Sequence, residues 1–147
     1  MNYIFSTEKT KRYRFPTHIN DLVMDRSEAT ASEVFFTVVE PGKTSPMHKH
    51  DDTEQIYYVV DGEGELTIET EEEPLLIKIK PGDVVRMPVG TMHRARCLGD
   101  QILRYLVVDC FPGSRPDAEP TWDSHVHEIC RLNGWDYDEV FEESDEY

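Results

Sequence analysis

Four side chains of this sequence combine residue types and a spacing that suit a metal ion. His48 and His50 are separated by a single residue, Gln55 follows them, and His93 lies far downstream. Imidazole nitrogens and an amide oxygen are lone-pair donors that bind divalent transition metals. We therefore predict that these four residues hold one divalent transition metal, and iron, manganese, nickel and zinc are all compatible with such ligands.

The sequence around these residues has the alternating pattern of β-strands. Alternate residues of a strand point to the same side, so the rings of His48 and His50 can converge while the residue between them points away. The same alternation predicts that Gln55 and Tyr57 share an inward face. His93 must then come from a neighbouring strand, which antiparallel hairpins can bring close.

Short alternating segments separated by turn signals fill the middle of the chain. Pro-Gly pairs at 41–42 and 81–82 and a Pro-Val-Gly turn at 88–90 interrupt them. The predicted strands are 34–39, 55–60, 65–70, 75–80, 84–87, 92–98 and 102–108. This pattern predicts an all-β fold, a single antiparallel barrel or jelly roll.

The rest of the chain is expected to form an arm and an extension of one compact domain. Residues 1–33 are predicted as an N-terminal arm, 34–112 as the barrel, and 113–147 as a C-terminal extension that packs on the barrel or on a partner subunit. Apolar residues at helical spacing predict a short helix from Trp122 to Leu132, which the Asn-Gly pair at 133–134 would end.

The two segments that carry the histidines resemble the two signature motifs of the cupin superfamily. The matching positions are Gly42, His48, His50 and Gly62 in the first motif, and Gly82, Pro88, Gly90 and His93 in the second. The resemblance covers about residues 34 to 112. It implies a double-stranded β-helix, the jelly roll of small single-domain cupins, and it implies a homodimer.

The sequence departs from the family pattern at two positions. Gln55 stands where the family has a glutamate, and Cys97 replaces the asparagine that ends the second motif. The resemblance places the fourth ligand at Gln55, because Glu54 should point to the opposite face. A neutral amide leaves the charge of the ion uncompensated, so the site should favour anionic ligands, and the open coordination positions suit catalysis.

Further side chains are candidates for catalysis or substrate binding. Tyr57 shares the inward face of Gln55, and either Tyr57 or Glu54 could move a proton. Arg86 and Arg104 are candidates for pairing with a carboxylate or phosphate. Tyr105, on the last predicted strand, could hydrogen-bond a substrate.

Three functions are compatible with these residues. A dioxygenase would bind a chelating enol or diol, and an isomerase, cyclase or lyase would polarise a substrate carbonyl. A non-catalytic cupin would only bind a small sugar or acid. We favour a metal-dependent enzyme acting on a small oxygenated, anionic metabolite, and the three histidines and Gln55 leave the choice between oxygen and proton chemistry open.

Composition and charge narrow the expected partners. The net charge of −15, from 30 acidic and 15 basic residues, argues against nucleic acid or an anionic membrane as a partner. Much of the acidic excess lies in the tail from Asp136 to Glu146. No signal peptide or long apolar stretch is visible, so we expect a cytoplasmic protein whose partner is a small molecule.

Overall fold

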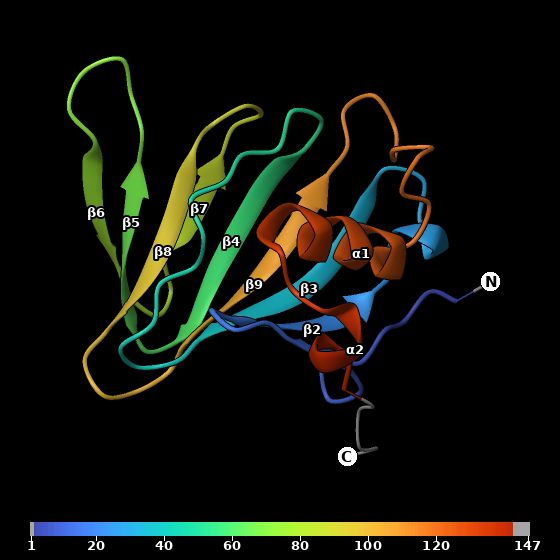
Figure 1. Ribbon diagram of the computed structural model, residues 1–147, viewed down its shortest axis with the longest axis horizontal. Helices are drawn as coiled ribbons and strands as arrows, with labels where there is room; N and C mark the ends of the chain where they lie inside the picture. The colour runs from blue at the N-terminus through green and yellow to red at the C-terminus, as the bar shows by residue number, and fades with distance from the viewer. Residues whose placement is uncertain (1, 143–147) are drawn as a thin grey trace.

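Two antiparallel β-sheets form the framework of the computed structural model, which describes residues 2–142 (Figure 1). The larger sheet has the spatial order β1 (Lys11–Arg14), β2 (Ile19–Met24), β3 (Ser32–Val39), β9 (Leu103–Cys110), β4 (Glu54–Asp61) and β7 (Val84–Met87). The smaller sheet has the order β6 (Leu75–Ile79), β5 (Glu63–Ile68) and β8 (His93–Leu98). The predicted all-β fold is confirmed, although the ladders between described strands leave two separate sheets instead of one closed barrel.

Alternation along β4 sorts its side chains between the two faces of the larger sheet. Gln55, Tyr57 and Val59 are buried, whereas Tyr58 and Val60 are exposed. This matches the predicted inward parity, because a strand with one face in the core must bury every second residue.

The register of β3, β9 and β4 lines up the inward side chains in rows. Glu33 pairs with Asp109, and Asp109 pairs with Gln55 on the other side. The next inward row contains Val107 and Tyr57. A row of polar residues therefore crosses the sheet next to apolar ones.

The N-terminal segment adds two strands to the sheet, where the sequence analysis expected an arm. β1 pairs with β2, and β2 pairs with β3. Tyr13 and Phe15 are fully buried in the common core, at 0% and 1% exposure. The N-terminal residues therefore share one hydrophobic core with the predicted barrel.

The residues from Thr44 to His50 form an extended segment without a regular strand. Single antiparallel bridges connect Thr44 with Arg96 and His48 with His93. The His48 N–H donates to the His93 carbonyl at 3.0 Å, and the His93 N–H donates to the His48 carbonyl at 2.9 Å. This reciprocal pair places two predicted metal ligands side by side.

The glycine that ends the first motif is required by the backbone. Gly62 joins β4 to β5 with φ of +74°, and a Cβ there would lie 2.0 Å from the carbonyl oxygen of Ile102. Any other residue would clash with this neighbouring backbone and be strained at positive φ.

The predicted C-terminal helix is confirmed as α1 (Trp122–Asn133), followed by the short α2 (Tyr137–Val140). At the start of α1, the Thr121 side chain accepts from the Ser124 N–H, and the Ser124 side chain accepts from the Thr121 N–H. Gly134 ends the helix in the left-handed conformation. Figure 1 shows α1 lying across β9 and β3. In residues 2–142, no helix combines the length and apolar character needed to cross a membrane.

A buried ion pair fastens the C-terminal extension to the sheet. Arg26, in the short 3₁₀ helix η1 (Arg26–Glu28), donates to both carboxylate oxygens of Glu33 at 2.8 and 2.9 Å. The same guanidinium donates to the carbonyl of Glu119, at 3.0 Å, just before α1. Since both charged side chains are almost fully buried, this contact ties the two parts of the chain together from inside.

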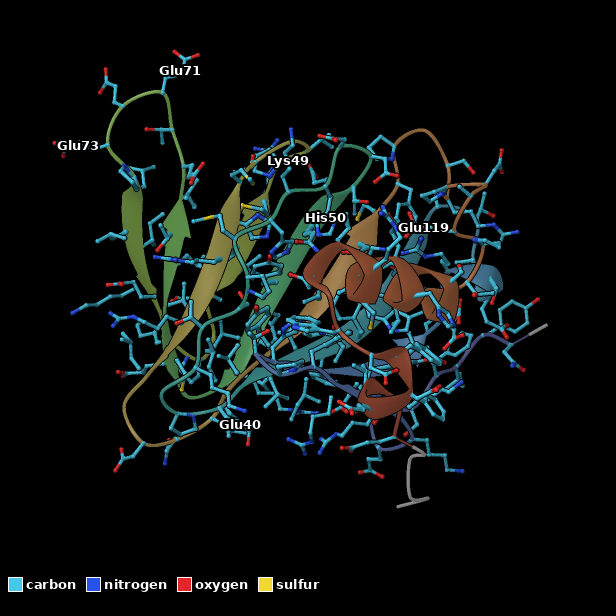
Figure 2. All side chains as sticks on the ribbon, in the orientation of Figure 1. Glu40, Lys49, His50, Glu71, Glu73 and Glu119 are labelled. Atoms are coloured by element: carbon cyan, nitrogen blue, oxygen red, sulfur yellow. The ribbon has the colours of Figure 1, made fainter. Side chains whose placement is uncertain are left out.

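Some acidic side chains lie far from helix α1, and others lie close to it. Figure 2 shows Glu71 and Glu73 on the loop between β5 and β6, at the end remote from α1, whereas Glu119 lies close to the helix on the side of His50. The end of the predicted acidic tail, residues 143–146, lies outside the described residues.

Candidate metal and substrate site

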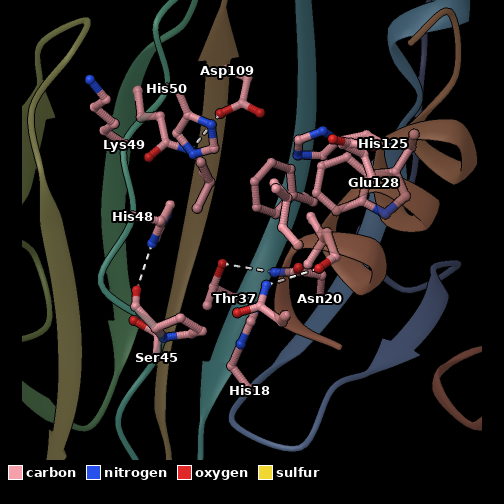
Figure 3. A pocket seen from close by; sticks show the side chains of 18 of the residues that line it. His18, Asn20, Thr37, Ser45, His48, Lys49, His50, Asp109, His125 and Glu128 are labelled. Carbon is pink, nitrogen blue, oxygen red and sulfur yellow. Dashed lines mark hydrogen bonds between the residues drawn. The ribbon is translucent and has the colours of Figure 1, made fainter. Parts of the chain in front are cut away.

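A cavity of about 640 Å³ opens between the inner face of the larger sheet, the extended histidine segment and helix α1 (Figure 3). Small-molecule sites in proteins commonly measure roughly 300–1,000 Å³. The predicted residues His48, His50, Gln55, Tyr57 and Tyr105 all line it. The cavity is therefore large enough for a metabolite, and most of the predicted site faces it.

Three histidine rings gather beside the cavity, and two of them line it. The ring centre of His48 lies 5.0 Å from that of His50 and 4.4 Å from that of His93, and His50 and His93 are 6.3 Å apart. His93 lies behind the wall, next to His48 and Tyr57. The sequence prediction that these three side chains converge agrees with this geometry.

Backbone carbonyls determine which ring nitrogen of His48 and of His93 carries the proton. Nδ1 of His48 lies 2.7 Å from the carbonyl of Pro46, and Nδ1 of His93 lies 2.7 Å from the carbonyl of Thr91. A carbonyl only accepts, so each Nδ1 carries the proton and each Nε2 keeps its lone pair.

Burial keeps these imidazoles neutral. Burial, with a smaller contribution from the nearby His48, lowers the pKa of His93 to about 4. Burial also lowers the pKa of His48 and places that of His50 well below its usual value. Metal ions bind the neutral form of imidazole, so these rings would not have to lose a proton near pH 7 to bind one.

Tyr57 bridges two of the predicted ligands. Its hydroxyl donates to Gln55 Oε1 at 2.8 Å and lies 2.9 Å from His93 Nε2. Both of these atoms are acceptors, and a phenol has one proton to share between them. One lone pair at this point is therefore always without a proton, and that lone pair can bind a cation.

The donor set fits a divalent transition metal in its chemistry. His48, His50 and His93 supply neutral imidazoles, and Gln55 supplies an amide oxygen. Within residues 2–142, no three His, Cys, Asp or Glu side chains form a ready-made metal cage. Binding an ion therefore requires the rings to adjust and the Tyr57 hydroxyl to leave at least one of its two acceptors.

Asp109 sets the direction of the Gln55 amide. Gln55 Nε2 donates to Asp109 Oδ1 at 2.8 Å, so the amide oxygen turns toward Tyr57 and the histidines. Burial, together with the neighbouring Glu33, raises the pKa of Asp109 well above its usual range. Asp109 acts on the ligand set by positioning Gln55.

Besides His93, which lies behind the wall, three side chains singled out in the sequence do not line the cavity. Arg86 donates to Glu54 at 3.2 Å on the outer face of the sheet, where the Arg86 side chain is 66% exposed. The guanidinium of Arg104 lies 3.6 Å from the ring centre of Phe36. These positions alternate with the buried ones on their strands, which turns Glu54, Arg86 and Arg104 away from the histidines.

Residues outside the two motifs complete the cavity, and the sequence analysis did not assign them to it. Trp122 and His125 come from α1, and Glu119 precedes that helix. Asp109 could have been found by extending the alternation of β9 past Val107, because both residues are buried. No local signal places α1 over the sheet, since that contact joins parts of the chain that are distant in sequence.

Three known proteins are similar in sequence to part of this chain. The chain is 32% identical over 82 residues to an uncharacterized protein of Methanocaldococcus jannaschii, covering 56% of this chain and 62% of that protein. It is 30% identical over 97 residues to quercetin 2,3-dioxygenase of Bacillus subtilis, and the aligned region covers 65% of this chain and 28% of that protein. It is 32% identical over 73 residues to 5-nitrosalicylic acid 1,2-dioxygenase of Bradyrhizobium sp., and the aligned region covers 49% of this chain and 33% of that protein. The match spans less than two thirds of each of these relatives.

The fold and the family are confirmed by two further similarities. The structure of KdgF from Halomonas sp. superimposes with a TM-score of 0.62 at 23% identity, covering 78% of this chain and 97% of that one. Residues 35–109, about half of the chain, match the cupin domain family. The two motifs, the jelly-roll strands and this match agree, and the chain belongs to the cupin family.

Proposed function

We propose that this protein is a metal-dependent cupin enzyme acting on a small oxygenated, anionic metabolite. The observation that carries the proposal is the cluster of three neutral imidazoles, two of which, His48 and His50, line the cavity. Nε2 of His48 and Nε2 of His93 are unprotonated, which is the state that a metal ligand requires.

His48, His50, His93 and Gln55 would hold the ion. When bound, a divalent metal supplies a positive charge that attracts and polarises an oxygen of the substrate. None of these four ligands is an anion, so the positive charge of the ion remains available to an anionic substrate. We therefore expect carboxylate, enolate or phenolate ligands to bind better than neutral ones.

The remaining side chains of this wall orient the ligands and exclude water. Tyr57 and Tyr105 are buried, their ring centres are 4.8 Å apart, and burial raises the pKa of both hydroxyls. Both phenols therefore stay protonated and can donate a hydrogen bond to a substrate oxygen. Asp109 keeps the Gln55 amide oxygen directed at the site.

Oxygen chemistry is our first candidate for the reaction. Two relatives named as dioxygenases share about a third of their residues with this chain in the aligned regions. An isomerase, cyclase or lyase is the second candidate, because the Tyr57 hydroxyl stands next to the ligands and can give or take a proton. A cupin that binds a small molecule without turnover is the alternative to both.

Metal content and oxygen consumption test the proposal. We expect near-stoichiometric metal in the purified, untagged protein, measured by plasma mass spectrometry. Iron or nickel together with oxygen uptake on adding an enol or catechol supports the dioxygenase, and zinc or manganese without oxygen uptake supports the isomerase or lyase. A protein that neither contains metal nor takes up iron, nickel, manganese or zinc contradicts the proposal.

A further inference from the structure

Helix α1 brings a further histidine to the cavity, from outside the matched cupin domain. His125 lies near the start of α1 and lines the cavity together with His48 and His50. Figure 3 shows His50 and His125 on facing walls, one from the extended segment and one from the helix. Their ring centres are 6.2 Å apart, and those of His50 and His93 are 6.3 Å apart. His125 is therefore as close to His50 as the predicted ligand His93 is.

The ring of His125 presents the nitrogen that a metal ligand needs. Nδ1 lies 2.6 Å from Glu119 Oε1. The hydrogen bond from His125 lowers the pKa of Glu119, so this carboxylate is ionised near pH 7 and accepts the Nδ1 proton. Within residues 2–142 no hydrogen bond to His125 Nε2 is found, and the buried polar atom without a partner is Trp122 Nε1. Nε2 of His125 is therefore both unpaired and accessible from the cavity.

This arrangement is the one that histidine ligands of metals commonly have. Such a histidine donates its other ring N–H to a carboxylate or a backbone carbonyl, which fixes the ring and its tautomer. His48 donates in this way to the carbonyl of Pro46, and His125 donates to Glu119. His125 thus has the same preparation as the histidines of the motifs.

The charge beside His125 favours a cation. In the described part of the chain, the Glu119 carboxylate pairs with His125 and with no lysine or arginine. The guanidinium of Arg26 donates to the Glu119 carbonyl instead, which holds the backbone before α1 in place. A carboxylate bonded to a histidine makes the ring a better donor to a metal and offsets part of the charge of the ion.

The separation of the two walls is within reach of one ion. A metal–nitrogen bond of about 2 Å places an ion roughly 3 Å from a ring centre, so two rings that share an ion have centres at most roughly 6 Å apart. The 6.2 Å between His50 and His125 lies at this limit, as does the distance between His50 and His93. A small movement of either ring therefore brings His125 into range, as the motif histidines also require.

We propose that His125 is a further ligand of the ion at the histidine wall, and that Glu119 positions it. The ion is a divalent transition metal, because the added donor is an imidazole. The inference rests on the proposed function for the presence of the ion. It adds that the ion joins α1 to the extended histidine segment across the cavity.

Zinc and cobalt are the probes for this ligand. We expect His125→Phe, which keeps a ring beside Trp122, to bind zinc about tenfold to hundredfold more weakly than wild type, measured by competition with a chromophoric chelator. Glu119→Gln keeps an acceptor for Nδ1 but loses the charge, and should weaken zinc binding about tenfold. In the cobalt-loaded protein each ligating imidazole gives a paramagnetically shifted, exchangeable N–H proton resonance. His125→Phe should show one such resonance fewer than wild type.

Two matched variants serve as controls. His127→Phe changes a histidine on the same helix that is 56% exposed and does not line the cavity. Glu128→Gln changes a carboxylate of the same helix whose charge is already paired with Arg131. Both should keep the wild-type zinc affinity and the wild-type number of shifted resonances, and unfolding midpoints of all variants identify any loss of fold.

The outcomes separate this inference from the proposed function. An unchanged number of shifted resonances in His125→Phe would overturn the assignment of His125, even if zinc binds more weakly, because a change in helix packing alone removes no ligand. Loss of metal in His50→Ala would then leave the proposed function standing. Wild type that binds neither zinc nor cobalt would overturn both. Where His125→Phe fails to fold, His125→Ala takes its place and the number of resonances decides.

Discussion

The hydroxyl of Tyr57 is a feature of the site that the histidine motif does not predict. It lies within hydrogen-bond distance of both Gln55 Oε1 and His93 Nε2, and it has one proton for two acceptors. A metal would use both lone pairs and relieve this mismatch. The alternation of β4 predicted that Tyr57 faces inward, whereas its distance to His93 depends on how β8 and β4 approach each other.

Removing a histidine should remove the metal. We expect His50→Ala and His93→Ala each to reduce metal to well below one ion per chain, because each change deletes one of three imidazoles. Plasma mass spectrometry after loading measures this. Glu54→Gln is the control, since Glu54 pairs with Arg86 on the outer face, and it should keep the metal. Full metal retention in both histidine variants would refute the ligand assignment.

Tyr57→Phe should bind zinc more tightly than the wild type. The change removes the hydroxyl that competes for His93 Nε2 and Gln55 Oε1, so the ion displaces nothing when it binds. We expect a severalfold lower Kd by calorimetry, and metal-free protein destabilised by about 1–3 kcal/mol from the unsatisfied acceptors. Weaker zinc binding in Tyr57→Phe would show instead that the hydroxyl supports the bound ligands.

Helix α1 is the element that turns an open sheet face into a cavity. It presents Trp122, Val126 and Cys130 to the core and is tied to the sheet through Arg26 and Glu119. The sequence predicted the helix from its apolar spacing and its stop signal. It did not predict which surface the helix covers, because helical periodicity states that one face is buried and does not identify the partner.

Arg26→Met should strongly destabilise the protein. The change leaves Glu33 buried at 0% exposure without its partner, which costs about 3–5 kcal/mol. Urea unfolding followed by tryptophan fluorescence measures this, since both tryptophans lie in the C-terminal extension. Arg86→Ala removes an exposed ion pair and should cost less than about 1 kcal/mol. Equal losses in the two variants would contradict the anchoring role of Arg26.

At the scale of the whole molecule, two groups of titratable residues affect stability in opposite directions. Burial lowers the pKa of His18 to about 3 and that of His93 to about 4, so the folded metal-free protein binds fewer protons than the unfolded chain. The contribution of these histidines to the stability of the folded state is complete above their unfolded pKa of about 6.5. It is lost as the pH falls toward their folded pKa values. Asp109, whose pKa is raised by burial, has the opposite effect.

A His18 variant isolates one of these contributions. Between about pH 7.5 and about pH 5, protonation of His18 in the unfolded state should cost wild type about 1–2 kcal/mol that His18→Gln does not lose. Urea unfolding of both metal-free proteins at the two pH values gives the difference, and Asp109 acts alike in both. A difference that stays constant with pH would mean that His18 titrates normally in the folded protein.

Local patterns determined much of this protein. Two motifs, their glycines and the alternation of short strands are properties of neighbouring residues, and they sufficed to predict the cupin fold, the inward faces of Gln55 and Tyr57 and the C-terminal helix. They also predicted that His48, His50 and His93 converge, because a jelly roll brings the two motif segments close together. The acidic composition, with a net charge of −15, is likewise fixed by the residues alone.

Tertiary structure alone decided what surrounds the histidines. The Tyr57 bridge to His93 and the link from Arg26 through Glu119 to His125 join residues far apart in the chain. Charge alone had suggested that Arg86 and Arg104 bind a substrate, but their strand positions place both side chains away from the histidines. Such contacts depend on how elements pack, and packing is a property of the whole chain that no single segment encodes.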